Sequence, residues 1–165
     1  MDAFATDSWA NFLVAETGAA AALSGLLFVA VSINLARVLA YPVLASRAAE
    51  SLALLIGGMV LCSLGLVPAQ PRWALGGEYL LGGATMWVFA SLHRLMKPRP
   101  AGADRIWKRI VPLLLGQAAT LPIIVAGALL IAGNAGGFYW FAAGVVFAFL
   151  AAALNAWVLL VEIMR

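Results

Sequence analysis

Cysteine and histidine are almost missing from this chain, and the shortage excludes whole classes of chemistry. The 165 residues contain one cysteine, Cys62, and one histidine, His93. A single cysteine cannot form an intrachain disulfide, and a structural metal site needs several cysteine or histidine ligands. The sequence therefore predicts no disulfide, no metal centre and no cofactor.

Motifs for catalysis are missing as well. The sequence has no Gly-rich phosphate-binding loop, no zinc-protease signature and no serine–histidine–aspartate set. An intramembrane hydrolase needs a nucleophile with a base beside it, and His93 is expected at the membrane surface, away from the serines of the apolar segments. We therefore expect a protein that is not an enzyme and has no catalytic residues.

Charged residues are few, whereas apolar residues dominate. Hydrophobic residues make up 65% of the chain and charged residues 10%, and the mean hydropathy is +1.02. A soluble domain has roughly a quarter of its residues charged. The formal charge of +3 would favour nucleic acid as a partner of a soluble protein, but here the basic residues lie in short loops. We interpret residues 1–165 as one integral membrane domain that contacts the lipid bilayer and no nucleic acid.

Five apolar segments are long enough to cross the hydrocarbon core, which takes roughly 20 residues of helix. They lack the period-2 alternation of barrel strands. The sequence therefore predicts an all-α, polytopic bundle of five transmembrane helices. These spans cover about 12–39, 48–67, 73–95, 110–132 and 138–161.

The basic residues predict the orientation of this bundle. Nine of the ten lysines and arginines fall on one side of the predicted membrane, many of them in the loop 96–109. Because cytoplasmic loops are enriched in lysine and arginine, we expect this loop and the C-terminus in the cytoplasm, the N-terminus outside, and the protein in a bacterial inner (plasma) membrane. Amphipathic aromatic rings also fall near the predicted interfaces: Trp9, Trp73, Tyr79, Trp107, Tyr139 and Trp140.

The first predicted span has a face of small side chains. A small face lets two helix backbones approach closely in lipid. This face either packs inside the monomer or joins copies of the chain. Its members follow one another at steps of three or four residues: Gly18, Ala22, Gly25, Val29 and Ser32.

A second stripe on the same span is polar at both ends, with its members separated by about 100° per residue. In a ring of copies it would stack an acidic ring, apolar constrictions and a basic exit, as many pores do. Alternatively, the acidic residue lies at the headgroup level and the basic residue extends to its own interface. The predicted pore-lining residues are Glu16, Ala20, Leu23, Leu27, Asn34 and Arg37.

Three polar residues in other spans are further candidates. Glu78 either joins Glu16 in an outer vestibule or pairs with Arg72. Gln117 and Thr120 lie near mid-membrane, shortly before Pro122, which removes a backbone hydrogen bond. They either form part of a transport site at a helix break or hydrogen-bond to neighbouring helices.

These observations predict a homo-oligomeric ion channel or transport pore lined by the first helix and passing a small ion. A lone five-helix bundle has little interior left for a conduit, so this function requires assembly. The alternative is a non-conducting adaptor or regulatory subunit of a larger membrane complex, which would use its helices and the basic loop as contacts.

Overall fold

The described part of the protein is entirely helical. The computed structural model describes residues 6–95 and 106–163, so the predicted loop 96–109 lies mostly outside these ranges. Every regular element within them is an α-helix, which confirms the all-α prediction for the described residues. The helices are α1 (Thr6–Ile33), α2 (Leu35–Ala40), α3 (Pro42–Gly65), α4 (Arg72–Leu95), α5 (Ile106–Ile131) and α6 (Gly137–Ile163).

Four of these helices are long and apolar enough to cross a membrane, which indicates an integral membrane protein. The qualifying segments are Trp9–Ile33, Leu44–Gly65, Leu113–Ile131 and Gly137–Trp157. The fifth predicted span, α4, is not among them, since it carries Glu78 and four glycines. The five-span count and the orientation therefore stay predictions.

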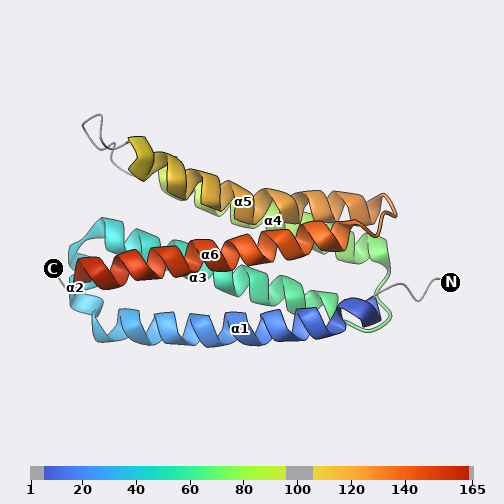
Figure 1. Ribbon diagram of the computed structural model, residues 1–165, viewed down its shortest axis with the longest axis horizontal. Helices are drawn as coiled ribbons and strands as arrows, with labels where there is room; N and C mark the ends of the chain where they lie inside the picture. Colours follow the sequence, from blue (N-terminus) through green and yellow to red (C-terminus); the bar gives the residue numbers. More distant parts are fainter. Residues whose placement is uncertain (1–5, 96–105, 164–165) are drawn as a thin grey trace.

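The helices form two groups that meet at α3 and α6. Helices α4 and α6 both pack extensively on α5, while α1 packs mainly on α3. Figure 1 shows α1 along one edge of the molecule and α5 along the other, with α6 between them. We call the end where α1, α4 and α6 begin the aromatic end, and the opposite end, which holds α2, the basic end.

Glycines allow the backbones of α4, α5 and α6 to come into direct contact. A Cβ on Gly127 of α5 would lie 2.5 Å from the Leu80 nitrogen and 2.6 Å from the Gly76 oxygen, both on α4. A Cβ on Gly137 of α6 would lie 2.8 Å from the Ala126 oxygen of α5. Without side chains at these positions, the backbones touch, and van der Waals packing stabilises the helix pairs in lipid.

The first predicted span is divided in two. The Asn34 side chain donates to the Ala30 oxygen at 3.0 Å, and α1 ends at Ile33. Asparagine competes with the backbone for hydrogen bonds and so favours helix ends. The continuous helix predicted over 12–39 is therefore wrong at its basic end, and Arg37 belongs to the separate helix α2.

The second predicted span begins earlier than its apolar pattern predicts. Tyr41 is extended, with φ −121° and ψ 101°, and Pro42 opens α3. Proline is favoured in a first helical turn, and the residue before a proline avoids the helical region. As a result, Glu50 lies more than two turns inside α3 and is buried.

Aromatic side chains gather at the aromatic end, with one correction to the prediction. Trp73 and Tyr139 are 69% and 72% exposed, as expected at an interface. Tyr79, by contrast, is fully buried, and its ring stacks on Phe141 with centroids 4.1 Å apart. It follows the buried Leu75 by four residues and therefore lies on the buried face of α4.

Candidate functional site

Helix α1 is the most peripheral of the four apolar helices. Only 17% of its most apolar window is buried inside the molecule, against 39% to 50% for the other three. It contacts α3 along its length and α6 much less. One face of α1 carries the predicted pore-lining stripe and another carries the small residues. Each can therefore be assigned either to the interior of the bundle or to its surroundings.

The predicted pore-lining stripe faces the interior. Ala20 is fully buried, and Leu27 is 8% exposed and packs with residues of α3 and α6. Leu23 is more open, at 39% exposed. Within one chain, this face of α1 is therefore directed towards α3 and α6 and away from the surroundings.

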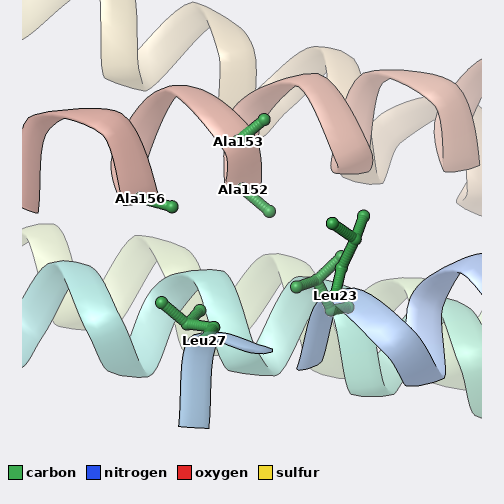
Figure 2. Close-up of a pocket in the computed structure, with 6 residues that line it drawn as sticks. Leu23, Leu27, Ala152, Ala153 and Ala156 are labelled. Atoms are coloured by element: carbon green, nitrogen blue, oxygen red, sulfur yellow. The ribbon is translucent and has the colours of Figure 1, made fainter. Parts of the chain in front are cut away.

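An apolar groove separates α1 from α6 along this stripe. Figure 2 shows Leu23 and Leu27 on α1 opposite three alanines of α6. Leu55 of α3 completes the lining, and the groove holds about 40 Å³. The two leucines that were predicted to form a constriction thus face small side chains across a narrow space. The α6 residues are Ala152, Ala153 and Ala156.

The polar ends of the stripe are placed differently from each other. Glu16 is partly buried, and its Oε2 atom is buried with no hydrogen-bond partner among the described residues. At the basic end, Asn34 is engaged with the Ala30 oxygen, and Arg37 is exposed on α2. The stripe is therefore continuous from Glu16 to Leu27, but its basic end is carried by a different helix.

The small-residue face of α1 points outward. Apart from the adjoining backbone of α1 itself, no described atom lies within 4 Å of the position that a Cβ on Gly18 or Gly25 would occupy. Ala22 and Val29 are exposed on the same face, and the Ser32 hydroxyl donates to its own helix, to the Phe28 oxygen at 2.8 Å. The close approach that these residues permit is therefore not used within the chain.

Glu78 lies near the aromatic end of α4, beside the buried Tyr79. Its Oε2 atom is buried and has no hydrogen-bond partner among the described residues. Arg72 donates to the Gly133 oxygen in the α5–α6 turn at 3.1 Å. This bond ties the start of α4 to the turn beside it.

The mid-membrane pair on α5 is hydrogen-bonded. Gln117 accepts a bond of 2.6 Å from the Trp87 indole of α4, and the buried Thr120 donates to the Gly116 oxygen at 2.8 Å. Helix α5 continues through Pro122 without interruption. Whether Gln117 and Thr120 also contact a transported species stays a prediction.

The Trp87–Gln117 bond leads to a stability prediction. Replacing Trp87 with phenylalanine or Gln117 with leucine should each lower the free energy of unfolding by roughly 1 kcal/mol, as for other interhelical bonds in membranes. Because the two side chains share one bond, the double variant should lose little more than either single variant. Unfolding in detergent, followed by circular dichroism, measures this. Trp157→Phe, at a position 67% exposed on α6, is the control, and full additivity would contradict the shared bond.

Sequence reasoning missed one polar side chain, the Tyr79 hydroxyl. It is buried and has no hydrogen-bond partner among the described residues, an arrangement that costs about 1–3 kcal/mol. Tyrosine near a helix end normally indicates an interface. The spacing of Tyr79 from Leu75 was the available signal that it lies on a buried face.

Comparisons with known proteins give no assignment. Protein-family models, curated proteins and solved structures all yield no match to this chain. Within the described ranges, there is also no group of three or more His, Cys, Asp or Glu side chains that could hold a metal ion. The function must therefore be argued from the geometry of α1 and its neighbours.

Proposed function

We propose that the protein is a non-enzymatic, homo-oligomeric channel or transport protein of the bacterial inner membrane, and that α1 provides the path for a small ion. One observation carries the proposal. The leucines predicted to form a constriction, Leu23 and Leu27, line a groove between α1 and α6. Apolar constrictions that open by wetting are a common gate in membrane pores.

The proposed path runs along the inner face of α1 within each copy, and it replaces the path along the axis of a ring of copies that the sequence predicted. Ala20 and Leu27 are covered by the chain's own helices, so they are poorly placed for the axis of a ring. Glu16 stands at the aromatic end of the path and Asn34 at the basic end. Their separation along the helix is roughly 27 Å, close to the hydrocarbon thickness of about 30 Å.

The other face of α1 supports assembly. At Gly76 and Gly127, the lack of a side chain lets α4 and α5 come into contact. Gly18 and Gly25 also lack side chains but have open space in front of them. A second copy of α1 could approach there as closely as α4 approaches α5. Assembly would also hold α1 in place while the groove between α1 and α6 opens.

A flux measurement tests the path. Leu27→Ser should raise ion flux into liposomes by roughly tenfold, because a hydroxyl at the constriction favours its wetting. Glu16→Gln should lower cation flux by removing charge from the entrance. The matched control is Leu26→Ser: Leu26 is 69% exposed and lies about 100° around α1 from Leu27, so its substitution should leave flux unchanged.

Two results would contradict the proposed path. Liposomes that contain wild type or Leu27→Ser protein and conduct no better than empty liposomes would exclude a channel. An equal rise in flux for Leu26→Ser and Leu27→Ser would show general loosening of α1 rather than a change in a constriction.

The adaptor function is the second candidate, and the open face of α1 also favours it. Helix α1 has few partners within its own chain, and a different membrane protein could fill the space in front of Gly18 and Gly25. A protein that purifies as a monomer and conducts no ions would support this candidate over the channel.

A further inference from the structure

The groove between α1 and α6 is open to the surroundings of the protein along one side. Leu23 of α1 is 39% exposed and Ala153 of α6 is exposed, although both line the groove. Next to Ala153 on α6, the side chains of Leu154 and Trp157 are 50% and 67% exposed. Lipid tails are as apolar as leucine, so this surface is suited to contact lipid. Lipid chains can therefore reach the groove from its open side.

The lining of the groove favours an apolar occupant. All six lining residues are leucines or alanines. A water molecule in a cavity needs several polar partners, and these side chains offer none. An apolar chain, by contrast, gives each lining side chain van der Waals partners that a void would withhold.

The size of the groove excludes a helix. The groove holds about 40 Å³, whereas a helix with its side chains is roughly 10 Å wide. Leu23 and Leu27 face the alanines of α6 directly across this space (Figure 2). A hydrocarbon chain is one methylene group wide and can follow such a narrow space along a helix. A lipid chain therefore fits the groove, and a helix of another protein or of a second copy does not.

The apolar cluster that lines the groove continues to two arginines at the basic end. Three groove residues, one from each helix, pack in one cluster with Val38 of α2 and Ala48 of α3. Arg37 directly precedes Val38, and Arg47 directly precedes Ala48. Arg37 is exposed and Arg47 is half-buried. Guanidinium groups bind phosphate strongly, so an anionic headgroup complements this end of the cluster.

The acidic residue of this region faces another helix. Glu50 is the only acidic residue in α2 and α3, and it is buried. It lies on the same face of α3 as Gly57, seven residues later, and a Cβ on Gly57 would contact Met86 of α4. Leu55, which lines the groove, lies about 140° around α3 from Glu50. Glu50 is therefore directed towards α4 and does not oppose an anion near the groove.

The depth of the groove matches one leaflet of a bilayer. Leu23 lies ten residues before the end of α1 at Ile33, which is roughly 15 Å along the helix. The acyl chains of one leaflet fill half of the hydrocarbon core, again about 15 Å. A lipid with its phosphate at the level of α2 can thus place an acyl chain along Leu27 and Leu23.

We propose that the groove between α1 and α6 binds one acyl chain of an anionic phospholipid, and that Arg37 and Arg47 bind its phosphate. Binding itself does not require transport. The regulatory consequence rests on the proposed function, because the acyl chain would occupy the proposed ion path at Leu23 and Leu27. Bound lipid keeps this constriction dry and closed, and the chain must leave before the constriction can open by wetting.

Native mass spectrometry of the purified protein with dioleoyl phosphatidylglycerol tests the site. Wild type should retain one such lipid per chain in preference to dioleoyl phosphatidylcholine, which has the same acyl chains but no net charge. Ala153→Leu should abolish binding because the larger side chain fills the groove. Ala128→Leu, at an exposed position of α5, is the control and should retain it. Arg37→Gln and Arg47→Gln should each weaken binding about fivefold, the usual effect of one basic residue near an anionic lipid.

Three results would overturn the lipid site. Binding that persists in Ala153→Leu would show that the lipid lies outside the groove. Loss of binding in Ala128→Leu as well would show that added bulk anywhere displaces the lipid. Equal retention of the two lipids, or binding that neither arginine variant weakens, would show that no headgroup is recognised.

Ion flux separates the lipid site from the channel. Wild-type flux should be several-fold higher in liposomes of phosphatidylcholine alone than in liposomes that also contain phosphatidylglycerol, and Arg37→Gln should reduce this difference. A protein that binds the lipid as expected but conducts nothing overturns the transport function alone. A protein that conducts equally in both kinds of liposome and retains no lipid overturns the lipid site alone.

Discussion

Replacing Gly127 with alanine is expected to lower the free energy of unfolding by about 3 kcal/mol, near the upper end of the usual range for overpacking. The added methyl group would lie 2.5 Å from the Leu80 nitrogen, 2.6 Å from the Gly76 oxygen and 2.8 Å from the Leu80 Cα. All three atoms belong to the backbone of α4. No side chain can rotate away, so α4 and α5 must separate along their contact.

The matched control is the same substitution on α1. Apart from the adjoining backbone of α1, no described atom lies within 4 Å of a Cβ on Gly25, and alanine is favoured over glycine in a helix interior by roughly 0.5–1 kcal/mol. Gly25→Ala should therefore be neutral or stabilising. Thermal unfolding of both variants in one detergent, followed by circular dichroism, compares them. Equal stability of the two variants would show that α4 and α5 are not in backbone contact.

If the protein assembles as proposed, replacing both Gly18 and Gly25 with leucine is expected to convert the proposed oligomer to monomers and leave the helical fold intact. Both side chains would project from the outward face of α1 into space that is open in the single chain. Two leucines there would hold the backbone of a neighbouring copy several ångströms away and remove the close packing on which helix association in lipid depends. The mass of the protein–detergent complex, measured by light scattering, reports the change.

A leucine elsewhere on the surface separates this effect from added bulk. Ala128 is exposed on α5, so Ala128→Leu should retain both the oligomer and the helical content. If the double glycine variant keeps the wild-type mass, copies do not meet at this face of α1. If the wild-type protein is already a monomer, the homo-oligomeric function is wrong.

The sequence was sufficient to predict that the chain lies in lipid and where most of its helices lie. Long apolar segments with few charges can satisfy their backbone groups in lipid only as helices, and this requirement does not depend on tertiary contacts. The breaks were harder to locate. Helix α1 ends at Ile33, next to Asn34, whose side chain donates to the Ala30 oxygen, but the apolar pattern continues on both sides of Asn34.

The candidate site was predictable only in part. Periodicity placed Glu16, Leu23 and Leu27 on one face of a helix, and the structure brings the two leucines to one groove. The partners across the groove, the alanines of α6, carry no signal of their own in the sequence. The burial of the Tyr79 hydroxyl was also not predicted, since it depends on how α4 packs against α3 and α6.

By itself, the sequence determined that this chain is helical and belongs in lipid, because that outcome depends on hydropathy and backbone hydrogen bonding alone. Only the tertiary structure decided which face of α1 turns inward. Lipid and protein core are equally apolar, so an apolar helix contains no difference in polarity that would direct one face to the bundle. Packing of small and large side chains makes that choice, and it places the Glu16 stripe inside and the face with Gly18 and Gly25 outside.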